Sequence, residues 1–174
     1  MKINSYLKIV GLALIGFVIP YQANAQEYMV PDNTPAHIRD AVESNARSDE
    51  DTARDINRLP AEILTLADLN EGDTVIELSV LGQYYSTIIA DAIGPNGSLH
   101  MYDLVAFEGF GVAEPGNAFA ASHANTEYSL EDYDNANYPN GADAAYLING
   151  YHDLPERDND PEAMNERLFA TLRS

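Results

Sequence analysis

The 174-residue sequence contains no cysteine and no tryptophan. The lack of cysteine excludes a disulfide scaffold, a zinc ribbon, a thiol nucleophile and a lipid anchor on cysteine. Basic residues are scarce: nine Lys and Arg stand against 28 Asp and Glu, for a formal net charge of −19. We therefore expect no nucleic-acid partner, because such binding needs a basic patch that releases counterions. Apolar residues make up 45% of the chain, enough for one packed domain.

The N-terminus has the three parts of a secretory signal peptide. Lys2 and Lys8 form the basic region, residues 9–19 form an apolar run, and Ala23-Asn24-Ala25 matches a cleavage site. The apolar run is shorter than the roughly 20 residues that a membrane-spanning helix needs. We therefore predict that residues 1–25 are a signal peptide and that the mature chain is periplasmic or secreted. After cleavage we expect no contact with a membrane.

Cleavage would leave seven arginines, no lysine and all 28 acidic residues. One interpretation is adaptation to salt, where charges are screened within about 8 Å or less. The other is a docking surface for a cationic partner. The acidic residues are spread along the chain and do not form one block, which favours adaptation to salt.

The first part of the mature chain is predicted to be helical. Residues 26–46 read as an unstructured lead followed by a helix that Thr34 caps. Ser48 then resembles a capping box with Asp51 that opens a short acidic helix to about residue 57, and Pro60 begins another helix. These helices precede the first predicted strand.

A change of pattern at residue 74 indicates an α/β domain over 47–174. Residues 74–78 form a continuous β-branched run, typical of a strand buried on both faces of a parallel sheet. A helix over 83–93 and a second strand over 98–103 complete a βαβ unit. The remaining predictions are a loop over 104–116, a helix near 117–124, strands over 127–130 and 144–149, a polar surface loop over 131–143, and a last helix from Pro161.

The turn after the first strand is the place where a doubly wound sheet binds a ligand. It contains Gly82, and Asp103 follows 21 residues later. That spacing is close to the roughly 20 residues that separate a glycine turn from a ribose-binding acid. A single glycine is no G-x-G-x-x-G motif, so two interpretations remain open. The segment is either a nucleotide site or an ordinary turn followed by a solvated acid.

Several blocks in a fixed order resemble a family of predicted secreted class I S-adenosylmethionine-dependent methyltransferases. The resemblance covers roughly residues 45–174. The matching blocks are Arg54-Asp55, Arg58 to Glu62, Glu71 to Val75, the helix around Tyr85, Gly94 to Gly97, Tyr151-His152-Asp153, and Ala163 to Leu172. The resemblance implies a Rossmann-like class I methyltransferase fold, S-adenosylmethionine as cofactor and an unknown methyl acceptor.

The resemblance also implies a cofactor site. Glu77 and Gly82 would line the amino-acid side of S-adenosylmethionine, and Asp103 would hold the ribose hydroxyls. The family usually has a glycine-rich turn after the first strand, whereas this sequence places Val80 and Leu81 there. We expect these branched side chains to resist positive φ and to crowd the path of the methionine part of the cofactor.

The methyl-transfer centre is expected just beyond the fourth strand, where Asn149, Tyr151 and His152 would shape it. His152 has an intrinsic pKa suited to a base if the acceptor carries a proton. A loop histidine bonded to the backbone is the alternative. The three other histidines are isolated in the sequence, and we predict no metal site.

In the resembled family the last helix leads into a further turn and three more strands, whereas this sequence ends at Ser174. We therefore expect the N-terminal half of the sheet, strands 3-2-1-4, with the fourth strand at an open edge. A fragment, a decayed gene product, and half of a split pair whose partner chain completes the sheet all fit this expectation. Two functions follow: a methyltransferase, or a catalytically inactive relic or interaction module of the same fold.

Overall fold

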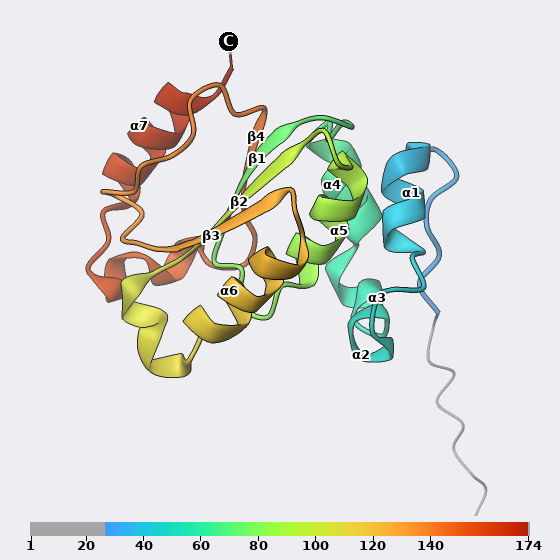
Figure 1. Cartoon of the computed structure of the whole chain (residues 1–174), viewed down its shortest axis with the longest axis horizontal. Helices are drawn as coiled ribbons and strands as arrows, with labels where there is room; N and C mark the ends of the chain where they lie inside the picture. Colours follow the sequence, from blue (N-terminus) through green and yellow to red (C-terminus); the bar gives the residue numbers. More distant parts are fainter. Residues whose placement is uncertain (1–26, 174) are drawn as a thin grey trace, which may run out of the picture.

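Four parallel strands form one sheet in the order β3-β2-β1-β4 in this computed structural model, which describes residues 27–173 (Figure 1). The predicted signal peptide, residues 1–25, lies outside the described residues. The strands are β1 (Thr74–Leu78), β2 (Ser98–Asp103), β3 (Thr126–Leu130) and β4 (Ala144–Leu147). The predicted strand order is confirmed.

Helices cover both faces of the sheet (Figure 1). They are α1 (Ala36–Val42), α2 (Asp49–Thr52), α3 (Asp55–Arg58), α4 (Pro60–Leu66), α5 (Tyr84–Ile93), α6 (Ala113–Ser122) and α7 (Pro161–Thr171), with 3-10 turns η1 (Val105–Phe110), η2 (Tyr151–Asp153) and η3 (Pro155–Arg157). One core joins α1, α4 and α5 to one face, and a second core packs α7, η1 and the 131–143 loop on the other. No helix within residues 27–173 is long and apolar enough to cross a bilayer.

Strand β1 lies between both cores, as its continuous apolar run predicts. Val75 belongs to the core under α5, whereas Ile76 and Leu78 belong to the opposite core. Successive side chains of a strand point to opposite faces, so Glu77 shares the α5 face with Val75. The strand therefore places one carboxyl group in an otherwise apolar layer.

The N-terminal helices differ in detail from the prediction. Thr34 does not cap α1: the N-cap is Pro35, and the Thr34 N–H instead closes a turn by donating to the Pro31 carbonyl. The capping box is confirmed, because Ser48 Oγ accepts from the Asp51 N–H at 3.1 Å. The single helix predicted from Ser48 to about residue 57 is wrong. It divides into α2 and α3, since Asp55 turns inward to bind Arg47.

The segment 131–143 is a loop, as predicted, but it does not lie wholly at the surface. Tyr133 and Tyr138 are buried there and belong to the second core. Burial is compatible with their hydroxyl groups because each finds a partner; the Tyr138 hydroxyl, for example, donates to the Tyr133 carbonyl at 2.8 Å. The dense polar residues around them conceal this in the sequence.

Helix α6 begins at Ala113, inside the stretch predicted as a loop. Glycines favoured the loop prediction, but Gly116 lies within the helix. A Cβ at Gly116 would stand 2.3 Å from the Tyr128 ring. This glycine therefore allows α6 to approach β3 closely and does not mark a turn.

The chain returns to the sheet after α7. Leu172 forms a parallel bridge with Ala142, and the Arg173 N–H donates to the Ala142 carbonyl at 2.8 Å. Within the described residues, this bridge alone pairs with the outer side of the β4 segment, whose residues Ala144–Leu147 form the edge of the sheet.

Candidate functional site

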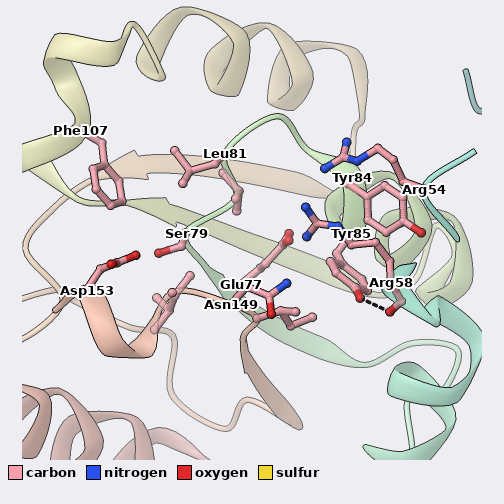
Figure 2. Close-up of a pocket in the computed structure, with 14 residues that line it drawn as sticks. Arg54, Arg58, Glu77, Ser79, Leu81, Tyr84, Tyr85, Phe107, Asn149 and Asp153 are labelled. Carbon is pink, nitrogen blue, oxygen red and sulfur yellow. Dashed lines mark hydrogen bonds between the residues drawn. The ribbon is translucent and has the colours of Figure 1, made fainter. Parts of the chain in front are cut away.

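A cavity of about 210 Å³ opens at the carboxyl ends of β1 and β4. This is the point at which the strand order changes direction, where open α/β sheets bind ligands. Figure 2 shows Glu77 and Asn149 between two walls, one with Arg54, Arg58, Tyr84 and Tyr85 and the other with Ser79, Phe107 and Asp153. Leu78, Val80, Leu81, Ile148 and Gly150 complete the lining.

The turn after β1 keeps positive φ away from its two branched residues, as predicted. Positive φ falls on Ser79 (60°), Gly82 (91°) and Gln83 (56°), so Val80 and Leu81 avoid it. Both branched side chains do line the cavity, with Val80 buried and Leu81 half exposed. Gly82 itself is not among the lining residues, so it serves the shape of the turn.

Tyr133 supports this turn from the opposite core. Its hydroxyl accepts from the Ser79 N–H at 2.8 Å and donates to the Tyr102 carbonyl at 3.2 Å. A non-glycine residue at positive φ costs of order 1 kcal/mol or more and needs such support. Sequence reasoning missed Tyr133, because nothing in the spacing links the 131–143 loop to the turn after β1.

Glu77 is the buried polar group of the cavity. It is 5% exposed, and its Oε2 atom has no hydrogen-bond partner in the described chain. Burial raises the pKa of Glu77 to about 8; the charge of Asp103 adds to the rise and the dipole of the Ser86 hydroxyl opposes it. An unpaired, desolvated carboxyl group beside a cavity is a candidate binding group.

Asp103 ends β2 and is fully buried. Its Oδ2 accepts from the Tyr128 hydroxyl at 3.2 Å, and its Oδ1 from the Leu81 N–H at 3.4 Å. Burial raises the pKa of Asp103, against the effect of these hydrogen bonds. Asp103 is not among the cavity-lining residues. The carboxylate that was predicted to bind a ribose instead accepts hydrogen bonds from the Tyr128 hydroxyl and from the backbone of the turn.

The segment after β4 packs tightly on the turn after β1. Asn149 takes positive φ (65°) and lines the cavity. A Cβ at Gly150 would lie 2.9 Å from Ser79 Oγ, so only glycine lets the two turns meet this closely. The structure thus brings Asn149 and Glu77 into one cavity.

The other two predicted catalytic residues lie outside the lining. Tyr151 is half exposed, and its hydroxyl accepts from Asn165 Nδ2 at 2.7 Å. The His152 side chain is 79% exposed, with Nε2 3.4 Å from Asp153 Oδ1. Asp153 lines the cavity, so His152 lies next to a lining residue while its own side chain is exposed to solvent.

Two arginines form the wall contributed by the N-terminal helices. The guanidinium carbons of Arg54 and Arg58 lie 4.9 and 5.4 Å from the centroid of the Tyr84 ring. The Tyr85 hydroxyl donates to the Arg58 carbonyl at 2.6 Å and so ties α3 to α5. Sequence reasoning gave these arginines no role, although two guanidiniums four residues apart are conspicuous where basic residues are so few.

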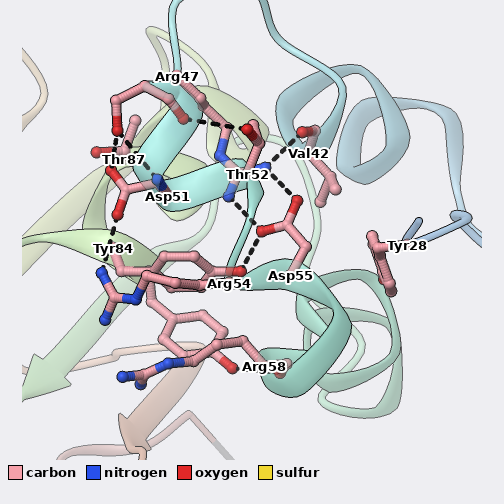
Figure 3. Close-up of polar contacts among 12 residues, drawn as sticks. Tyr28, Val42, Arg47, Asp51, Thr52, Arg54, Asp55, Arg58, Tyr84 and Thr87 are labelled. Carbon is pink, nitrogen blue, oxygen red and sulfur yellow. Dashed lines mark hydrogen bonds and ion pairs between the residues drawn. The ribbon is translucent and has the colours of Figure 1, made fainter. Parts of the chain in front are cut away.

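A buried network fixes this wall to the rest of the protein (Figure 3). Arg47 binds both oxygens of Asp55 at 2.6 and 2.8 Å and donates to the Val42 carbonyl at 2.6 Å. The Tyr84 hydroxyl also donates to Asp55. The network joins α1, α3 and α5, so it determines where Arg54 and Arg58 stand. Across residues 27–173, no group of three or more His, Asp or Glu side chains could hold a metal ion.

Three solved structures are similar to this chain to different degrees. One is a SAM-dependent methyltransferase from Aquifex aeolicus, with 20% identity, a TM-score of 0.53, and coverage of 64% of this chain and 57% of that chain. An O-methyltransferase from Thermotoga maritima has 16% identity, a TM-score of 0.48, and coverage of 80% and 47%. Fibrillarin from Aeropyrum pernix, with natively bound S-adenosyl-L-methionine, has 17% identity, a TM-score of 0.44, and coverage of 61% and 44%.

The chain spans about half the length of these solved structures. Neither a protein-family model nor a curated protein matches the sequence. The Aquifex aeolicus likeness, together with the parallel sheet and its strand order, establishes the fold. The protein has a Rossmann-like class I methyltransferase fold.

Proposed function

We propose that this protein binds S-adenosylmethionine and transfers its methyl group to an acceptor that is still to be identified. One observation carries the proposal: Glu77, a buried residue whose Oε2 has no hydrogen-bond partner in the described chain, lines a cavity at the switch point of a methyltransferase fold. Burying a carboxyl group without a hydrogen-bond partner costs free energy unless a bound ligand supplies that partner. The ammonium of an α-amino acid is a suitable partner for this group.

Different residues of the site fit different parts of the cofactor. The cavity of about 210 Å³ is smaller than the roughly 300–1,000 Å³ typical of complete small-molecule sites, so it suits the amino-acid end alone. Asp103 would take the ribose hydroxyls once the Tyr128 hydroxyl gives up its hydrogen bond. Gly82 would keep the intervening turn in shape.

The bound cofactor supplies an electrophilic methyl group on a sulfonium. The contribution of the chain is to orient the acceptor in line with that group and to exclude water. Asn149 would contact the reacting end from within the cavity, and Tyr151 would border it. His152, at the solvent side next to Asp153, would accept a proton from an arriving acceptor.

We also propose that the protein acts outside the cytoplasm, on the strength of the signal-peptide pattern in residues 1–25. N-terminal sequencing of the exported protein is expected to begin at Gln26. A sequence that begins at Met1 would refute export by cleavage.

Calorimetric titration of the folded protein with S-adenosylmethionine tests the cofactor assignment. Asp103→Asn retains the size of the side chain and removes its charge, so we expect the affinity to fall at least about tenfold. Asp91→Asn, which changes an exposed acid on α5 outside the cavity, is the matched control and should bind like the wild type. Absence of binding by folded wild-type protein would refute the proposal and favour an inactive relic or interaction module.

A further inference from the structure

We propose that Arg54 and Arg58 form a carboxylate clamp in the cavity that Glu77 also lines, so that the cavity recognises the zwitterionic end of an α-amino acid. This inference rests on the proposed function and names the groups that hold the amino-acid end of the cofactor. It concerns the N-terminal segment, which contributes no strand to the sheet.

The positive charges around Tyr84 are not all neutralised. Three guanidinium groups, those of Arg47, Arg54 and Arg58, lie within 5.4 Å of its ring centroid. Asp55 neutralises Arg47, and Asp51 pairs with Arg54 at 2.9 Å. In residues 27–173, Arg58 makes no ion pair within 4.0 Å. One positive charge at the cavity therefore lacks a partner.

Arg58 lines the cavity beside the Tyr84 ring. Arg157 and Arg167 also make no ion pair within residues 27–173, but of these three arginines only Arg58 lines the cavity. The side chain of Arg58 is not directed freely into solvent: it stacks near Tyr84 and lines the cavity, which Figure 2 shows together with Arg54. A planar guanidinium held on an aromatic ring is well suited to bind a carboxylate through two parallel hydrogen bonds.

Glu77, which lies between the two walls of the cavity, supplies a possible partner for a cation. Glu77 is 5% exposed with its Oε2 unpaired, and it lines the same cavity as the two arginines. The cavity is thus lined by the donors of two arginines and by the carboxyl group of Glu77. A ligand that satisfies both must carry an anion and a cation a short distance apart, as the carboxylate and ammonium of an amino acid do.

A ligand–variant cycle tests the clamp. Affinities for S-adenosylmethionine and for decarboxylated S-adenosylmethionine, which lacks only the carboxylate, are measured by calorimetry on the wild type, Arg54→Gln and Arg58→Gln. We expect each substitution to weaken binding of S-adenosylmethionine roughly ten- to a hundredfold and to leave binding of the decarboxylated ligand within about twofold. Arg58→Lys, which retains the charge but loses the planar fork, should recover part of the loss.

Arg39→Gln is the matched control, because Arg39 lies on α1 outside the cavity and should bind both ligands like the wild type. Thermal unfolding verifies that each variant is folded. Equal losses for both ligands, or no loss for either, would overturn the clamp while the cofactor assignment stands. A folded wild type that binds neither ligand would overturn the proposed function and the clamp with it.

Discussion

At the scale of single residues, Glu77 makes the site sensitive to pH. Its folded-state pKa is raised from 4.5 to about 8 by burial, so the folded protein keeps the proton that the unfolded chain has lost between these values. Folding stability contributed by this group is therefore fully present below pH 4.5. It declines as the pH rises and is lost above about pH 8.

Glu77→Gln removes this titration and should stabilise the protein at alkaline pH. We expect the difference in unfolding free energy between the variant and the wild type to grow from pH 4.5 to pH 8, by at most about 5 kcal/mol. Urea unfolding at a series of pH values measures it. A difference that stays constant with pH would show that Glu77 is already ionised in the folded protein.

The residue scale also shows where sequence reasoning succeeds. Glu77 and Asp103 could be predicted, because strand ends and their spacing are readable in one dimension. Arg58 and Tyr133 could not, since their roles depend on contacts with residues 26 and 54 positions away: the Arg58 guanidinium stacks near Tyr84, and the Tyr133 hydroxyl binds the Ser79 N–H. Spacing rules describe one strand and its turn, whereas these contacts join distant segments.

At the scale of elements, the short helices α2 and α3 depend on the rest of the protein for their position. Each has four residues, which is too few for a helix to be stable alone. The buried pair of Arg47 with Asp55 and the hydrogen bond from Tyr84 fix them to α1 and α5. The sequence predicted the start of this region from its capping box. It could not predict the break, which depends on Asp55 turning inward.

Asp55→Asn should destabilise the protein strongly, because it leaves the buried Arg47 charge without its partner. We expect a loss of about 3–5 kcal/mol in the free energy of unfolding. Glu43→Gln disrupts the exposed pair with Arg39 on α1 and should cost less than about 1 kcal/mol. Urea unfolding of both variants provides the comparison, and equal costs would contradict the importance of the network.

The fold can be predicted from the sequence because β1 and β2 have patterns typical of buried parallel strands, and turn residues separate them. The burial of tyrosines in the 131–143 loop cannot be predicted in the same way. The polar residues of this loop predict a position at the surface, while its tyrosines pack in the core. Tyrosine has an apolar ring and a polar tip, so a hydropathy pattern assigns it poorly.

At the scale of the whole molecule, the excess of acidic residues dominates. A net charge of −19 on one small domain produces self-repulsion that favours the unfolded chain. Salt screens such repulsion over a Debye length of about 10 Å at 0.1 M and about 3 Å at 1 M.

Sodium chloride should therefore stabilise this protein. Between 0.05 and 1 M we expect the free energy of unfolding to rise by about 1 kcal/mol or more, which corresponds to about 2–4 °C in Tm for a domain of this size. Thermal unfolding followed by circular dichroism measures it. A Tm that stays constant or falls between 0.05 and 1 M sodium chloride would contradict self-repulsion as a dominant cost of folding.

The hydroxyl of Tyr133 has a consequence for how this fold can change over time. It reaches from the loop on one face of the sheet to the turn at the carboxyl end of β1, which borders the cavity. Surface loops usually tolerate insertions and deletions, but a change of length here would withdraw the support of Ser79. Changes in the sequence of the 131–143 loop therefore affect the turn at the cavity. We expect substitutions in one of these segments to be accompanied by compensating substitutions in the other.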